Sequence, residues 1–336
     1  MREEEKINNG VMKSSDDDDD EVVMIPCLDF SFYNNNNGLE NWKKMMSKKV
    51  REACERHGLF YLVCDDQIIP KGLRENMIMG MKELFDLPEE TKMKHQTTKA
   101  YGSYTSESPL SQSFGVYDSH LLQVSQEFTN LMWPNGNSSF CETMNSMSAK
   151  LLELNYMILK MIQEGYDLPK HYIWETEDML MKGAVYFRLM RYKVPSKENN
   201  KEAGENGLVA HTDKNTLTIL AQNDVEGLEM QTKSGKWIQL EIPHNAYVVI
   251  VAETLKAWSN GRLHAVNHRV KMKGDKERYS LGLFTMPKEE AKIEVPPELV
   301  DGNTHPLRYK PFTHGDFIKY FVSTLDENAL DAFAGL

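Results

Sequence analysis

The chain has 336 residues, of which 40% are hydrophobic, so it can bury a sizeable core. It has no apolar run of the roughly 18 residues that a transmembrane helix needs, and its acidic first residues lack the apolar region of a secretory signal, so we expect a cytoplasmic protein that does not bind membranes. The formal net charge of −11 argues against nucleic acid as a partner, because phosphate attracts the opposite sign.

Residues 1–22 form a charged segment of low apolar content that includes the run Asp16–Asp20. Such a segment cannot offset the entropy lost on ordering by burying apolar surface, so it predicts a disordered acidic tail. A calcium site is the alternative interpretation of the aspartate run. Nothing positions those side chains, however, and the solvated tail is favoured.

Residues 23–180 are predicted to form a helical N-terminal region. From Leu39 to His57 the apolar residues recur every three to four positions and Gly58 follows, a pattern typical of an amphipathic helix. The other expected elements are strands at 25–30 and 59–63 and helices at 70–85 and 142–164. The segment Tyr101–Ser125 is rich in Gly, Ser, Tyr and Pro, and it predicts a long surface loop of the kind that lines binding sites.

After about residue 181 the apolar pattern alternates with the period of two that indicates strands. The predicted strands are Ala184–Tyr192, Thr216–Ala221, Gly227–Gln231, Trp237–Leu240, Tyr247–Val251, Val266–Met272 and Tyr279–Thr285. Lys197–Gly207 is charged and predicts an exposed loop, and Phe312–Phe333 predicts a helix. Short strands separated by turn signals favour a β-sandwich or a jelly roll.

The sequence His-Thr-Asp places His211 and Asp213 two residues apart, so on a strand both side chains would point to the same face. His268, in a later predicted strand, can complete a set of two imidazoles and one carboxylate. This set fits the facial triad that binds non-haem Fe(II) and leaves positions open. His264 would face the same side as His268 and competes with it for the third position.

Ten residues after His268, Arg278 and Ser280 share one face of a predicted strand. Together they offer a guanidinium fork and a hydroxyl to a carboxylate. A lone His-x-Asp is weak evidence, and Arg278 could instead pair with a surface glutamate. The conjunction of the metal donors with this clamp indicates an oxygenase that consumes an oxo acid.

Several motifs resemble the plant iron(II)/2-oxoglutarate-dependent dioxygenases of specialised metabolism, over nearly everything from Ile25 to the C-terminus. They include Ile-Pro-Cys-Leu-Asp-Phe, His-Thr-Asp-Lys-Asn, Gly-Leu-Glu-Met-Gln, Ser-Asn-Gly-Arg-Leu-His-Ala-Val-Asn-His-Arg-Val and Arg-Tyr-Ser. Phrases such as Arg-Tyr-Ser-Leu-Gly-Leu-Phe are most similar to the subgroup that contains glucosinolate side-chain dioxygenases and steroidal glycoalkaloid hydroxylases.

The resemblance implies a fold that is mainly β with α. A double-stranded β-helix (jelly-roll) core over residues 181–290 would be flanked by the N-terminal helices and by a C-terminal helical extension over residues 291–336. In the family pattern the last metal ligand immediately precedes an arginine, which favours His268 over His264. The pattern also adds Tyr192 to the 2-oxoglutarate contacts of Arg278 and Ser280.

The implied function is an oxidoreductase that uses Fe(II), with 2-oxoglutarate and O2 as co-substrates and ascorbate in support. It would hydroxylate a small plant metabolite such as a steroidal alkaloid or terpenoid, release succinate and CO2, and act as a monomer. Glucosinolate side-chain oxidation and the oxidation of auxin or another hormone are the alternatives. A jelly-roll binding protein without activity would be expected to lose a triad or clamp residue, and this chain retains all of them.

Three residues are predicted to line the substrate pocket: Phe284, Phe128 and Met132, with plain core packing as the alternative. The sequence departs from the family pattern at two points. Met190 stands where many members have asparagine, which removes one polar contact, and Ala252-Glu253 replaces the usual Gly-Asp.

Overall fold

The structure is a computed structural model that describes residues 23–31, 39–99, 101–169, 183–195 and 204–336. The acidic tail predicted over residues 1–22 lies outside the described residues, as does most of the predicted loop Lys197–Gly207. Within the described ranges, no helix combines the length and the apolar character that crossing a bilayer requires.

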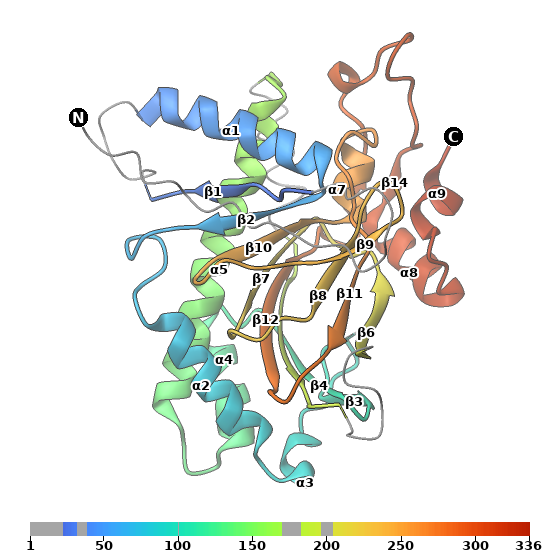
Figure 1. The fold of residues 1–336 in the computed structure, drawn as a ribbon. Helices are drawn as coiled ribbons and strands as arrows, with labels where there is room; N and C mark the ends of the chain where they lie inside the picture. The colour runs from blue at the N-terminus through green and yellow to red at the C-terminus, as the bar shows by residue number, and fades with distance from the viewer. Residues whose placement is uncertain (1–22, 32–38, 100, 170–182, 196–203) are drawn as a thin grey trace, which may run out of the picture.

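An eight-stranded sheet dominates the fold, with strand order β1-β2-β10-β7-β12-β5-β4-β3 (Figure 1). Its strands are β1 (Cys27–Asp29), β2 (Leu59–Val63), β3 (Thr105–Ser108), β4 (Ser111–Tyr117), β5 (Val185–Tyr192), β7 (Leu217–Gln222), β10 (Tyr247–Val251) and β12 (Arg278–Thr285). β1 pairs with β2 in parallel, and the other neighbours are antiparallel. One sheet therefore contains strands from both the N-terminal region and the later strand-rich part of the chain.

A second sheet of four strands packs against one face of the large sheet, in the order β6-β11-β8-β9. Its strands are β6 (Glu205–His211), β8 (Leu228–Gln231), β9 (Trp237–Gln239) and β11 (His268–Met272). Two facing sheets of mainly antiparallel strands are the arrangement of a jelly roll. A separate two-stranded sheet pairs β13 (Lys292–Ile293) with β14 (Phe312–Thr313).

Helices cover the other face of the large sheet, where the long helix α5 packs on α1, α2 and α4 and lies against β7 and β12 (Figure 1). The helices are α1 (Leu39–Arg56), α2 (Leu73–Phe85), α3 (Glu89–Lys92), α4 (Leu122–Met132), α5 (Ser138–Gly165), α7 (Glu253–Trp258), α8 (His314–Thr324) and α9 (Ala329–Ala334), with a 3-10 helix at Pro297–Leu299. The predicted fold class, a jelly-roll core with flanking helices, is confirmed.

Alternation along β5 separates the two cores. Phe187 and Leu189 point into the helical core, whereas Met190 and Tyr192 belong to the core between the sheets. Because successive side chains of a strand point to opposite faces, each strand of the large sheet sends one set of residues to the helices and the other toward the second sheet. The space between the sheets is where the predicted site residues gather.

The predicted loop Tyr101–Ser125 is wrong, because it contains β3, β4 and the start of α4. β4 is almost entirely buried beside β5, yet only Phe114 and Val116 carry its apolar face. The opposite face consists of glycine and polar residues, which obscures the alternation that a strand normally shows. The loop predicted to extend to Gly207 is also wrong at its end, since β6 begins at Glu205.

The seven predicted strands after residue 181 are confirmed to within two residues at each end. The single helix predicted over Phe312–Phe333 is instead two helices, α8 and α9, which pack on each other. The Thr313 side chain caps the first turn of α8, and Leu325 ends that helix in a left-handed conformation with φ 52°. The chain can therefore fold back at this point and close the C-terminal end of the core.

Candidate metal centre and carboxylate clamp

Two histidines face each other where β6 pairs with β11. His211 is the last residue of β6 and His268 the first of β11, and the two are partners in the strand register. Their ring centroids lie 4.4 Å apart. Antiparallel pairing therefore brings together two imidazoles that are far apart in the sequence.

Asp213 lies two residues beyond the end of β6, so the expectation that it shares a strand with His211 is wrong. The chain turns here, and the backbone carbonyl of Asp213 accepts a hydrogen bond of 2.9 Å from the N–H of Glu253. The carboxylate nevertheless faces both rings, with Oδ1 3.6 Å from Nε2 of His211 and 3.9 Å from Nε2 of His268. A turn, not a strand face, completes the set.

Both imidazoles are held with Nε2 directed at the carboxylate. Nδ1 of His211 donates to the carbonyl of Val209 at 2.9 Å, and Nδ1 of His268 donates to the carbonyl of Val266 at 3.2 Å. This tautomer leaves each Nε2 lone pair available to a metal. The ligand atoms of His211, Asp213 and His268 all lie within 4.8 Å of one another, and donors around one first-row ion lie about 3–4 Å apart, so the three residues fit a divalent iron.

The protonation of these groups suits a cation. Burial opposes ionisation of Asp213, but His268, His211 and the Thr218 hydroxyl outweigh it and hold the pKa of the carboxyl well below its usual range. Burial and the neighbouring His211 lower the pKa of His268 to about 4, so its ring is neutral at physiological pH. One carboxylate and two imidazoles are a donor set that suits a ferrous ion.

Arg278, at the start of β12, is buried between the two sheets with 1% of its surface exposed. Its Nε and Nη2 donate to Oε1 of Gln222 at 3.0 and 2.7 Å, and its guanidinium carbon lies 5.1 Å from the ring centre of Tyr192. Nη1 is buried and has no hydrogen-bond partner. A buried cation with an open donor is incomplete without an acceptor, and a carboxylate is the strongest one.

Ser280, which strand alternation placed on the face of Arg278, and Tyr192, which the family resemblance added, both lie on the face of the sheet that carries Arg278. Tyr192 is the register partner of Arg278, and Ser280 lies one alternation further along β12. The Tyr192 hydroxyl donates to the sulfur of Met190 at 3.4 Å, so the residue that departs from the family pattern contacts a clamp residue directly. The three predicted clamp residues therefore occupy one face, in the space that the metal donors also face.

Sequence reasoning missed two supporting residues on β7. Gln222 orients the Arg278 guanidinium, and the Thr218 hydroxyl donates to Oδ2 of Asp213 at 2.6 Å. Both point to the same face of β7 as Leu220, because they alternate with it. Two polar residues in a strand that is buried throughout are the signal that could have found them.

Glu253 explains the Ala252-Glu253 departure from the family pattern. Its buried Oε1 accepts hydrogen bonds from the Thr212 hydroxyl and, at 2.9 Å, from Nζ of Lys214. Lys214 also reaches the carbonyl of Thr212 at 3.0 Å. This ion pair therefore holds both residues that flank Asp213 against the start of α7.

We expect the variant Glu253→Ala to lose about 3–5 kcal/mol of unfolding free energy, because it leaves the ammonium of Lys214, whose side chain is only 11% exposed, without its carboxylate partner. Urea denaturation of the purified protein measures this. The exposed Glu241→Ala serves as the control and should stay within about 0.5 kcal/mol of wild type. The double variant Lys214→Met/Glu253→Leu removes both charges and should recover much of the loss. Equal midpoints for the variants at Glu253 and Glu241 would contradict this account.

The three residues predicted to line the substrate pocket lie on different faces of the large sheet. Phe284 packs against the core between the sheets, with its ring 5.5 Å from that of Tyr186. Phe128 and Met132 are buried in the helical core, on the opposite face of the large sheet from Arg278. His264 lies next to Gly58, and its backbone N–H donates to Cys54, so it stands apart from the three-ligand cluster.

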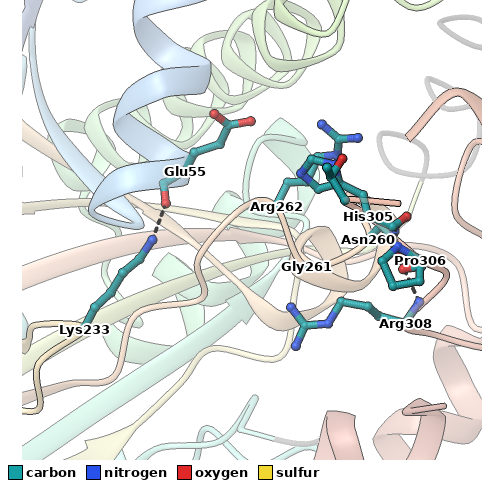
Figure 2. A pocket seen from close by; sticks show the side chains of 9 residues that line it. Glu55, Lys233, Asn260, Gly261, Arg262, His305, Pro306 and Arg308 are labelled. Carbon is teal, nitrogen blue, oxygen red and sulfur yellow. Dashed lines mark hydrogen bonds between the residues drawn. The ribbon is translucent and has the colours of Figure 1, made fainter. Parts of the chain in front are cut away.

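A separate surface cavity of about 430 Å³ lies between the end of α1 and the loops around residues 260 and 305 (Figure 2). Lys233 and Arg308 are exposed on its wall, and the ammonium of Lys233 donates to the Glu55 backbone carbonyl at 2.9 Å. None of its lining residues belongs to the metal donors or the clamp. The cavity is therefore distinct from the candidate active site.

Comparison with known proteins supports the chemistry of these donors. The family model described as "2OG-Fe(II) oxygenase superfamily" matches residues 185–287. A second family model, described as "non-haem dioxygenase in morphine synthesis N-terminal", matches residues 25–133. The probable 2-oxoglutarate-dependent dioxygenase AOP1 of Arabidopsis thaliana is 37% identical over 298 residues, which cover 88% of this chain and 96% of that protein. The 2-oxoglutarate-dependent dioxygenase AOP3 of the same species is 28% identical and covers 93% and 97%.

Solved structures agree with the family models. The rice dioxygenase for auxin oxidation superposes with a TM-score of 0.77 at 26% identity, covering 92% of this chain and 99% of that one. The Arabidopsis thaliana dioxygenase for auxin oxidation 1, in its complex with 2-oxoglutarate, gives 0.73 at 26% identity and covers 84% and 100%. With its metal donors and buried clamp on a shared jelly-roll fold, the chain belongs to the iron(II)- and 2-oxoglutarate-dependent dioxygenases.

Proposed function

We propose that this dioxygenase hydroxylates a small plant specialised metabolite at an iron held by His211, Asp213 and His268. Arg278, Ser280 and Tyr192 hold the far carboxylate of 2-oxoglutarate in this proposal. The observation that carries it is the buried guanidinium of Arg278, whose Nη1 has no partner and which shares an inter-sheet space with three converged metal donors.

The protein residues have distinct tasks in this reaction. Iron, together with 2-oxoglutarate and oxygen, supplies the oxidising power for attack on a C–H bond, and succinate and CO2 are released. His211, Asp213 and His268 would hold the iron, and the positions that they leave open would be available to the co-substrates. The carbonyls of Val209 and Val266 fix the ring tautomers, and the apolar walls between the sheets keep water away from the reacting atoms.

For the substrate, the motif resemblance favours a steroidal alkaloid or terpenoid first, with a glucosinolate side chain as a further option. Similarity to the rice dioxygenase for auxin oxidation, over nearly the full length of both chains, favours auxin as a second candidate. The proposal also takes the enzyme to act as a cytoplasmic monomer, with ascorbate maintaining the iron in the ferrous state.

Incubation of the purified protein with Fe(II), ascorbate, 2-oxoglutarate and a plant metabolite extract is expected to produce succinate. Mass spectrometry of the same reaction should show one extract component gaining one oxygen atom. A parallel reaction with indole-3-acetic acid alone tests the auxin candidate. Absence of succinate in every reaction, with iron demonstrably bound, would refute the proposed function.

A further inference from the structure

Arg188 lies on the face of β5 that points between the two sheets, because it alternates with Phe187 and Leu189, which belong to the helical core. Its register partners are glycines on both sides, Gly115 on β4 and Gly282 on β12. Neither neighbour carries a side chain, so no residue directly across from Arg188 can neutralise its charge. The position puts a cation on the wall of the inter-sheet space.

The Nε–Nη2 edge of the Arg188 guanidinium is only partly hydrogen-bonded. Nη2 donates to the hydroxyl of Ser113 at 3.1 Å, and Ser113 is itself held by the hydroxyl of Thr105 at 2.8 Å. Nε is buried and has no hydrogen-bond partner. No carboxylate among the described residues forms an ion pair with this guanidinium, which makes it unusual for a half-buried charge.

Other arginines of this chain show what the free edge can hold. Arg191, on the opposite face of β5, donates hydrogen bonds of 2.8 to 3.1 Å from Nε and Nη2 to the carboxylate of Glu277. Arg278 uses the same edge on the amide oxygen of Gln222. On Arg188 this edge has only a hydroxyl at Nη2 and nothing at Nε. A planar anion such as a carboxylate would satisfy it.

The register places Arg188 within reach of the metal donors but outside the 2-oxoglutarate clamp. Gly282, its partner on β12, pairs in turn with Leu220 on β7, so Arg188 stands two strands, or about 10 Å, from the strand whose Thr218 holds Asp213. Arg278 lies four residues from Gly282 along β12, which is roughly 13 Å. A group bound by Arg188 is therefore not the carboxylate that Arg278 would hold.

Aromatic rings adjoin this cation. Tyr186 and Phe284 stand next to each other one alternation away from Arg188, with ring centroids 5.5 Å apart, on the same face of the sheet. The Tyr186 ring lies over Gly115, and the Phe284 ring lies over Gly282. The wall thus combines one incompletely bonded cation with two aromatic rings, an arrangement that suits a molecule with an apolar body and one acidic end.

We propose that Arg188 binds a carboxylate on the substrate and that this enzyme therefore selects acidic metabolites. The inference rests on the proposed function and narrows it. Within the candidate classes it favours an acidic terpenoid or auxin over an alkaloid, whose protonated amine Arg188 would repel. Arg188 acts here as a specificity-determining residue about 10 Å from the strand that supports the metal donors.

The test separates a plant metabolite extract by anion exchange into acidic and non-acidic fractions and offers each to the full chain with Fe(II), ascorbate and 2-oxoglutarate. We expect the acidic fraction to stimulate succinate formation and the stimulation to disappear after its carboxylates are converted to methyl esters. Stimulation by the non-acidic fraction alone, or unchanged stimulation after esterification, would overturn the proposal. These arms need only the wild-type protein.

Variants at the same position localise the effect. Arg188→Gln should raise the amount of acidic fraction needed for half-maximal stimulation roughly tenfold or more, and Arg188→Lys should do so less. The KM for 2-oxoglutarate and the slow 2-oxoglutarate consumption without substrate should both stay within about twofold of wild type. If Arg188 had only a structural role, its loss would change these two quantities as well. Arg308→Gln, the same change in the separate surface cavity, should behave as wild type.

The outcomes distinguish failure of the substrate assignment from failure of the proposed dioxygenase activity. If Arg188→Gln responds to the acidic fraction as wild type does, the specificity proposal is wrong while the dioxygenase remains active. If wild type consumes no 2-oxoglutarate with any fraction or without one, the proposed function itself fails. Equal impairment of Arg188→Gln and Arg308→Gln would mean that the loss is not specific to the position of Arg188 and would overturn that assignment.

Discussion

His268→Ala is expected to abolish succinate formation and to weaken Fe(II) binding by more than about 100-fold. Loss even of a group that only orients a metal ligand typically costs 10- to 100-fold, and this change removes one of the three donors themselves. His268 is also buried, so solvent does not readily replace its Nε2 as a donor. Metal analysis of the purified protein and titration of the ferrous charge-transfer absorption in the presence of 2-oxoglutarate measure the binding directly.

His264→Ala is the matched control, because it removes an imidazole four residues earlier in the same segment. Burial, Lys233 and Lys256 lower the pKa of His264 to about 4, so the change removes a neutral ring and no charge at physiological pH. We expect this variant to retain iron and most of its activity. Loss of iron from His264→Ala and its retention in His268→Ala would reverse the ligand assignment.

Arg278→Met is expected to raise the KM for 2-oxoglutarate by about 10- to 100-fold, with a smaller effect on kcat at saturation. Hydrogen bonds to a charged group contribute about 1.5–3 kcal/mol. Nη1 of Arg278 has no hydrogen-bond partner within the protein, so its bond to 2-oxoglutarate replaces no existing bond. Arg278→Lys keeps a cation but loses the planar fork, so we expect an intermediate KM. Steady-state kinetics with varied 2-oxoglutarate separates the two parameters.

Arg191→Met provides the comparison for that variant. Arg191 precedes Tyr192 on β5. It binds Glu277 and Asp86 on the face of the sheet that points away from the second sheet. Its loss should cost stability without changing the KM for 2-oxoglutarate. A similar KM increase in both variants would mean that the effect reflects general destabilisation, and the assignment of Arg278 to the carboxylate would be wrong.

Local pattern was sufficient for much of the site. Alternation predicts that Arg278 and Ser280 share one strand face, and both lie two residues apart in β12. The residue types of the metal donors follow from the His-Thr-Asp motif and from the histidine that precedes Arg269. The face that Arg278 and Ser280 share needs only neighbouring residues, because strand geometry converts a spacing of two into a shared face.

Features that depend on distant segments were missed or misplaced. The sequence predicts a loop where β4 lies, because the site-facing side of β4 carries glycine and polar residues, whose partners on β5 lie more than 70 residues away. Asp213 reaches the histidines from a turn held by Glu253, forty residues downstream. The support that Gln222 gives to Arg278 likewise depends on the pairing of β7 with β12.

From its sequence alone, the resemblance of its motifs to the iron(II)- and 2-oxoglutarate-dependent dioxygenases indicated the family and the donor residues, because such motifs are local properties of the chain. The tertiary structure decided which charges are satisfied. Only the pairing of β4, β5 and β12 shows Arg188 between two glycines with an open binding edge, whereas Arg191 finds its carboxylates on the other face. Strand register sets such contacts, and burial of apolar surface over the whole sheet selects that register.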